Sequence, residues 1–149
     1  MKILWFAWLL ALSCSVRAQG QTSTLVVYSE VMSSFNVDVS LFLNGQSIYP
    51  APLAKGNKLV HTVHSTGKIT LLAKVTNNPG FRSATLDLEF VPGKKYVLKM
   101  GVTKLHEQDG YVWLANVSDN AKHLAKLDKK AEKWSVVESE EEVADPYVK

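Results

Sequence analysis

The sequence predicts a mainly β fold, an antiparallel β-sandwich of about seven to eight strands with one C-terminal amphipathic helix. Apolar and polar residues alternate with a period of two in several stretches between residues 24 and 117, which is typical of half-buried strands. Turn-forming segments such as Asn44-Gly45 and Asn77–Gly80 separate these stretches. Residues 121–134 instead carry apolar side chains at helical spacing, which indicates a single helix near the end of the chain.

The stretch Phe81–Val102 predicts a central β-hairpin, because two alternating runs flank a proline-glycine turn. In the register that keeps the apolar side chains on one face, Leu88 pairs with Tyr96 and Glu89 lies opposite Lys95. Such exposed ion pairs contribute roughly 0.2–1 kcal/mol each, so they define register more than they stabilise the fold. We expect the acidic residues of this hairpin to have a structural role.

A second hairpin is predicted at Asn44-Gly45, since both residues of this dipeptide accept the positive φ of a two-residue turn. The turn pairs Leu43 with Gln46 and Leu41 with Ile48, which places Ile48 in the inward-facing row. Phe42 then falls on the opposite face.

The start of the chain predicts export. Lys2 precedes the apolar run Ile3–Leu12, and Val16-Arg17-Ala18 offers small residues where a signal peptidase cleaves, so residues 1–18 are interpreted as a signal peptide. No apolar run reaches the roughly 20 residues of a membrane-spanning helix. We expect a periplasmic or secreted protein that begins after Ala18. In the alternative, Ser13 precedes the mature N-terminus and a lipidated Cys14 holds the domain at a membrane surface.

Cys14 is the only cysteine, so the exported chain would form no disulfide of its own. An exported protein of this size without disulfides favours a bacterial periplasm. The glycosylation sequon Asn116-Val117-Ser118 points in the opposite direction.

The charge is unevenly distributed along the exported chain. Residues 19–137 carry 14 Lys and Arg against 9 Asp and Glu, whereas residues 138–149 carry one Lys against five acids. The exported chain is then nearly neutral, which argues against nucleic acid as a partner. We expect a flexible leader at 19–23, one domain at 24–135, and an acidic disordered tail at 136–149.

No motif for catalysis, metal or cofactor binding is present. The sequence has no Gly-x-Ser-x-Gly, His-Glu-x-x-His or phosphate-binding loop. His61 and His64 lie on opposite faces of a predicted strand, and no convergent set of metal ligands accompanies them. We therefore expect a protein that is not an enzyme and needs no cofactor. An uncharacterised hydrolase is the alternative, and it requires a concave pocket with two titratable groups.

We expect an envelope module that binds an unknown glycan, peptide or partner protein, and two surfaces are candidates for its function. Phe42, Tyr49 and Phe81 are candidate ligand contacts if at least two of these rings are exposed on one patch. Alternatively, lysines on one face of the helix would dock the domain on an anionic envelope surface. These lysines are Lys122, Lys126, Lys129, Lys130 and Lys133.

The order of elements resembles a family of small exported bacterial β-sandwich domains of unknown function, which are often attached to lipoproteins. The resemblance covers most of residues 24–134. It is carried by Val39–Gln46, Pro92–Leu98 and the closing helix. It implies an envelope protein with a binding or structural role, and it implies no catalytic residues.

Overall fold

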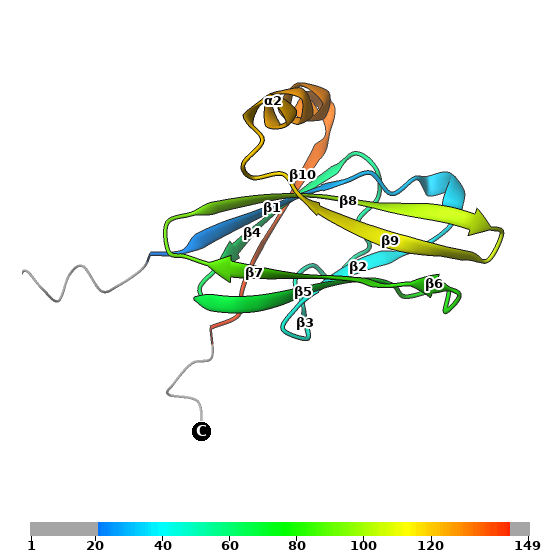
Figure 1. Cartoon of the computed structure of the whole chain (residues 1–149), viewed down its shortest axis with the longest axis horizontal. Helices are drawn as coiled ribbons and strands as arrows, with labels where there is room; N and C mark the ends of the chain where they lie inside the picture. The colour runs from blue at the N-terminus through cyan, green and yellow to red at the C-terminus, as the bar shows by residue number, and fades with distance from the viewer. Residues whose placement is uncertain (1–20, 144–149) are drawn as a thin grey trace, which may run out of the picture.

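The computed structural model of the chain describes residues 21–143 (Figure 1). The predicted signal peptide, Cys14 and residues 144–149 lie outside the described residues. The fold is mainly β, with two sheets and one C-terminal helix, as the sequence predicted. The described residues form ten strands, where the sequence predicted seven to eight.

The larger sheet has six strands in the order β10-β4-β1-β8-β9-β6. Their bounds are β1 Ser23–Ser29, β4 Asn57–Val63, β6 Phe81–Arg82, β8 Lys95–His106, β9 Asp109–Asn116 and β10 Ser135–Glu140. The pairs β1–β8, β4–β10 and β6–β9 are parallel, so the prediction of a wholly antiparallel fold is wrong. β1 lies between β4 and β8. It runs antiparallel to β4 and parallel to β8.

The smaller sheet has four antiparallel strands in the order β3-β2-β5-β7. Their bounds are β2 Val39–Leu43, β3 Gln46–Ser47, β5 Gly67–Val75 and β7 Ala84–Phe90. Figure 1 shows the two sheets as two layers. The core between them contains Leu25, Leu59, Leu98 and Met100 from the six-stranded sheet and Leu41, Ile69, Leu71, Leu88 and Phe90 from the four-stranded sheet. Each fully buried side chain of this kind contributes roughly 1.5–3 kcal/mol.

The predicted hairpin within Phe81–Val102 is wrong. β7 pairs with β5 in one sheet, while β8 pairs with β1 and β9 in the other. Between them the chain forms an arch at which the Tyr96 hydroxyl donates to the Glu89 carbonyl oxygen at 2.6 Å and accepts from the Val91 N–H at 2.9 Å. The Phe90 and Tyr96 ring centroids lie 4.8 Å apart. One side chain thus supplies hydrogen bonds that a hairpin would take from its partner strand.

The acidic side chains of β7 accordingly have other partners than predicted. Asp87 accepts a hydrogen bond from Thr70 Oγ1 at 2.6 Å and lies 3.4 Å from Lys68 Nζ. Glu89 is paired in register with Lys68, not with Lys95. These contacts lie on the exposed face of the four-stranded sheet.

The second predicted hairpin is confirmed. Leu43 pairs with Gln46 across a two-residue turn in which Asn44 has φ 47° and Gly45 has φ 83°. The Ile48 N–H donates to the Leu41 carbonyl oxygen at 3.1 Å, and Ile48 is buried as predicted.

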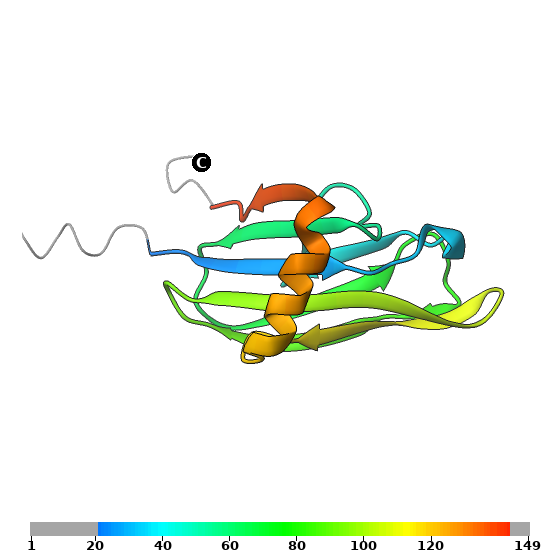
Figure 2. The ribbon, with the colours of Figure 1, turned by 90° about the horizontal axis from the view of Figure 1, so that it is seen from above.

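Helix α2 (Ala121–Lys130) continues into the 3₁₀ turn η2 (Ala131–Lys133), and a second short 3₁₀ turn, η1, spans Ser33–Phe35. The helix is capped by Asn120, whose side chain accepts a hydrogen bond from the His123 N–H. Figure 2 shows α2 lying across the six-stranded sheet, from β9 towards β10. Leu127 packs there in a cluster with Val26, Tyr28 and Val97 of the sheet.

The predicted disordered tail is wrong for residues 136–140, which belong to β10 (Ser135–Glu140) alongside β4. The segment has too few apolar residues to fold alone, but it adds to the edge of an existing sheet. Val137 packs against the core, and Glu141 accepts hydrogen bonds from the backbone N–H groups of His64 and Ser65. The amino-acid composition of this segment therefore did not predict that it forms a strand.

Within residues 21–143, no helix has both the length and the apolar character needed to cross a bilayer.

Candidate functional site

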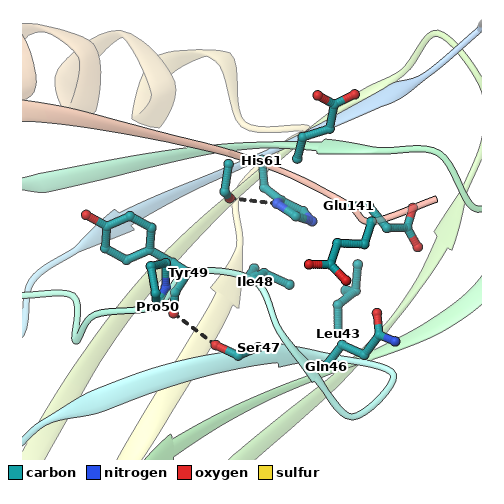
Figure 3. Close-up of a pocket in the computed structure, with 11 residues that line it drawn as sticks. Leu43, Gln46, Ser47, Ile48, Tyr49, Pro50, His61 and Glu141 are labelled. Atoms are coloured by element: carbon teal, nitrogen blue, oxygen red, sulfur yellow. Dashed lines mark hydrogen bonds between the residues drawn. The ribbon is translucent and has the colours of Figure 1, made fainter. Parts of the chain in front are cut away.

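A cleft of about 560 Å³ lies at one side of the molecule, between the β4–β10 edge and the chain that follows the β2–β3 hairpin (Figure 3). It is lined by Leu43, Gln46, Ser47, Ile48, Tyr49, Pro50, His61, Ser139, Glu140, Glu141 and Glu142. The volume is within the range of small-ligand pockets. β3, the edge strand of the four-stranded sheet beside the cleft, contains only two residues.

One wall of the cleft is largely apolar. Ile48 is buried and Tyr49 is half-buried, and both pack against the core between the sheets. The Ser47 hydroxyl donates to the Tyr49 carbonyl oxygen at 2.9 Å, which fixes the chain as it leaves the hairpin. β3 ends at Ser47, and Pro50 has no backbone N–H with which to extend the pairing to β2.

The opposite wall carries a buried histidine. His61 is 1% exposed and lies in the inward row of β4 with Leu59 and Val63, as the alternation predicted. It is paired in register with Ser139 of β10, whose Oγ lies 2.7 Å from Nδ1. The other ring nitrogen, Nε2, has no hydrogen-bond partner among residues 21–143. Figure 3 shows the ring directed into the space between β10 and the apolar wall.

His61 is held in its neutral form. Burial lowers the pKa of His61, since a charged ring would lose its hydration. The carboxylates of Glu141 and Glu140 act in the opposite direction, and His64 adds to the lowering, so the net pKa lies below the ordinary value of 6.5. At neutral pH the unpartnered nitrogen is therefore part of an uncharged ring.

The rim of the cleft is acidic. Burial alone would raise the pKa of Glu141, but hydrogen bonds from Ser65 Oγ and from the Ser65 and His64 N–H groups lower it below its ordinary value. The Glu141 carboxylate is therefore ionised, with the two N–H donors at 2.8 and 2.6 Å. The side chain of the neighbouring Glu140 points to the outer face of β10, where its carboxylate lies 2.6 Å from His64 Nε2. The exposed Glu142 completes the rim, which gives this side of the cleft a negative potential.

This arrangement suits a ligand with a hydrogen-bonding group next to an apolar part. A buried polar atom without a partner is destabilising, and a ligand that reaches Nε2 would remove that cost. Among residues 21–143, no three His, Cys, Asp or Glu side chains converge as a metal site would require.

The structure does not bring the predicted aromatic contacts together. Tyr49 lines the cleft, whereas Phe42 is half-buried in β2, outside the cleft, and is paired in register with Leu72. Phe81 is 6% exposed and belongs to the core, with its ring against Gly110. The three rings therefore form no common patch.

Sequence reasoning missed the part of the site that involves β10. His61 and His64 were placed on opposite faces of a strand, but Ser139 and Glu141 were assigned to the tail. The available signal was the β-branched pair Val136-Val137 directly after the helix, followed by Ser139 and Glu141 at a period of two.

The predicted basic stripe is found on α2 and η2, where all five lysines are exposed. Lys130 is engaged, because its Nζ lies 2.9 Å from Glu30, which also approaches Lys99 at 3.6 Å. The other four lie on the helix face opposite the side chains that pack on the sheet. We call these four, Lys122, Lys126, Lys129 and Lys133, the lysine ridge.

The fold and the cleft thus define a two-sheet β protein with a side cleft of mixed apolar and acidic character. In comparisons with known proteins, no family model, no curated protein and no solved structure matches the chain.

Proposed function

We propose that this chain is an exported, non-enzymatic β-sandwich module of the cell envelope whose cleft receives an extended peptide segment of a partner protein. The observation that carries the proposal concerns His61, which lines the cleft and whose buried Nε2 has no hydrogen-bond partner among residues 21–143. Pockets with an apolar wall and a few polar groups are the usual place for ligands. A peptide supplies both a donor and an acceptor in every residue, so it satisfies either tautomer of the neutral ring.

The lining favours a peptide over a glycan. Sugar rings commonly stack on the exposed face of an aromatic side chain, but Tyr49 is half-buried against the core and Phe81 is inaccessible. Ile48, Tyr49 and Pro50 instead offer a short apolar surface that suits an aliphatic side chain. The glutamates on the opposite rim favour a segment with positive charge.

A hydrolase in the same cleft is the alternative, because the cleft contains His61 and several glutamates as titratable groups. Ser139 would be the nucleophile and His61 its base. Ester hydrolysis also needs donors for the developing oxyanion, whereas Glu141 and Glu142 give the cleft beside Ser139 a charge of the same sign. If the cleft only binds peptides, Ser139→Ala should hydrolyse p-nitrophenyl acetate as fast as the wild-type protein does. Slower hydrolysis by the variant would support the hydrolase.

The binding proposal is tested by NMR titration of the protein with a pool of capped random hexapeptides and, separately, with chito-oligosaccharides. We expect the peptides to shift the resonances of His61, Ser139 and Tyr49, and we expect Tyr49→Ala to weaken this response. Phe42→Ala is the matched control, since Phe42 does not line the cleft. Shifts with the oligosaccharides alone, or shifts that Tyr49→Ala leaves unchanged, would refute the proposal.

A second candidate function is docking on an anionic surface through the lysine ridge. The ridge lies opposite the packed side of α2, so the helix can present its four ammonium groups without leaving the sheet. Sedimentation with phosphatidylglycerol vesicles tests this function. Binding should be strong at low salt, be lost at high salt, and fall in Lys126→Gln/Lys129→Gln but not in Lys55→Gln/Lys74→Gln. Attraction that persists at high ionic strength would exclude the ridge as its cause.

A further inference from the structure

β10 is the last strand of the six-stranded sheet, and within residues 21–143 only one of its sides is paired. The Ser135 N–H donates to the Gly56 carbonyl oxygen at 2.9 Å, and the Glu141 N–H donates to that of Thr62 at 2.8 Å. In a parallel ladder, alternate residues direct both backbone groups to the same neighbour. The even-numbered residues between these two donors, from Val136 to Glu140, therefore direct their N–H and C=O groups to the free edge.

The side chains of β10 alternate between the two faces of the sheet. Val137 and Ser139 are half-buried and lie on the cleft side, opposite Leu59 and His61 of β4. The even-numbered side chains are exposed on the outer face. Two of these are acidic, Glu138 and Glu140, so the free edge combines unpaired backbone groups with a negative outer row.

We infer that the partner segment adds to β10 as a further strand and alternates basic and apolar residues. This inference rests on the proposed peptide-binding function and specifies how the peptide is held. Backbone hydrogen bonds to Val136, Glu138 and Glu140 supply affinity, as in other cases of strand addition. The outward basic side chains face Glu138 and Glu140, and the inward apolar side chains enter the cleft beside Tyr49 and His61.

The acidic row distinguishes this partner from a second copy of the same chain. Pairing two β10 strands would bring Glu138 and Glu140 of both copies onto one face, where like charges opposite each other are destabilising. Charged residues on an edge strand also prevent uncontrolled pairing. The same charges that repel another copy attract a basic segment, so the edge is selective.

The test uses a capped peptide of about eight alternating valine and lysine residues, with the corresponding valine-glutamate peptide as the control. Amide hydrogen exchange is followed by NMR in the full exported chain. We expect the valine-lysine peptide to slow exchange at Val136, Glu138 and Glu140 by about tenfold or more at saturation. Exchange at Ser135 and Glu141 should change little, because their N–H groups are already bonded to β4.

Two substitutions at one position separate the backbone from the charge. Glu138→Gln removes the carboxylate and should weaken binding in a salt-dependent manner. Glu138→Pro also removes the free-edge N–H while leaving the ladder to β4 intact, and should weaken binding by a further three- to tenfold, roughly the value of one hydrogen bond. A valine-lysine peptide that is N-methylated at alternate residues should bind the wild-type protein as weakly as the unmodified peptide binds Glu138→Pro. This comparison tests the backbone hydrogen bonds without changing the protein.

The outcomes distinguish this inference from the proposed function. If the valine-lysine peptide shifts His61 and Tyr49 without protecting the even-numbered amides, strand addition is wrong and the cleft remains a peptide site. If only the random pool shifts them, the alternating pattern is wrong. If no peptide shifts the cleft, both proposals fall. Protection that depends on protein concentration alone, with a dimer in sedimentation, would assign the edge to a second copy.

Discussion

The Tyr28 hydroxyl donates a hydrogen bond to Oδ1 of Asp128 at 2.5 Å, which joins the centre of the six-stranded sheet to the last turn of α2. Tyr28 is 2% exposed, and the Trp134 ring meets it edge-on at a centroid distance of 6.0 Å. Leu127 packs in the same cluster. This contact holds the helix on the sheet and thereby positions the start of β10.

We expect Tyr28→Phe to lower the free energy of unfolding by about 1–2 kcal/mol, because the hydrogen bond to a charged acceptor is lost while the ring remains packed. Chemical denaturation followed by circular dichroism measures the change. Tyr111→Phe is the matched control, since Tyr111 is 36% exposed and should change stability little. Equal stability of the two variants would show that packing alone holds the helix.

The same tyrosine predicts a loss of stability at high pH. Burial raises the pKa of Tyr28 well above its ordinary value of 10.0, and the hydrogen bond to Asp128 and the charge of that residue raise it further. The contribution is fully present below pH 10 and is lost as the pH rises from 10 towards the folded-state pKa, because only the unfolded tyrosine ionises readily. Wild-type stability should therefore fall more steeply above pH 10 than that of Tyr28→Phe. Parallel curves for the two proteins would contradict this assignment.

His61 predicts a loss of stability on the acid side. Its folded-state pKa lies below 6.5, so the unfolded chain binds the proton more readily than the folded protein. The free energy of unfolding should therefore decrease as the pH falls below about 6.5, until the folded-state pKa is reached. The pH dependence should be reduced in His61→Phe and retained in His106→Phe, because His106 is exposed. An NMR titration of the His61 ring with a midpoint above 6.5 would overturn this prediction.

Two buried glycines should respond differently to alanine. A Cβ at Gly110 would overlap the carbonyl oxygen of Thr103 and the ring of Phe81, and the backbone there is fixed by the β8–β9 ladder. The nearest atoms to a Cβ at Gly101 belong to the ring of Trp113, a half-buried side chain that has room to rotate. We expect Gly110→Ala to destabilise by about 1–3 kcal/mol and Gly101→Ala by less, with a change in tryptophan fluorescence. Thermal unfolding of both variants decides the order.

The alternation of apolar residues was sufficient to assign most inward faces. Ile69, Leu71, Ala73 and Val75 of β5 are buried as the period of two predicted, and the Asn44-Gly45 turn has the predicted conformation. These features depend only on neighbours in the sequence, since the side-chain direction of a strand and the φ angles of a turn are local properties.

Strand partners were not predictable in the same way. Leu88 was expected opposite Tyr96 but is paired with Ile69, and both arrangements bury the same face of β7. The cleft was still harder to predict, because it brings together residues far apart in the sequence. His61 and Ser139 are 78 positions apart, and they meet only because the helix crosses the sheet before β10 begins. The acidic composition of the last residues suggested a disordered tail. In the structure the Glu141 carboxylate accepts hydrogen bonds from the N–H groups of His64 and Ser65, and the sequence alone does not show that these residues lie close to Glu141.

The arch between β7 and β8 depends on Tyr96, so Tyr96→Phe should destabilise the protein while leaving the ring contact with Phe90 in place. The substitution leaves the Glu89 carbonyl oxygen and the Val91 N–H without their side-chain partner. Because Tyr96 is only half-buried and water can reach these groups, we expect a loss of about 1 kcal/mol rather than the larger cost of a fully buried deletion. Tyr111→Phe again serves as the control in denaturant unfolding. A variant as stable as the wild type would show that the proline-glycine segment, not the hydroxyl, directs β8 into the opposite sheet.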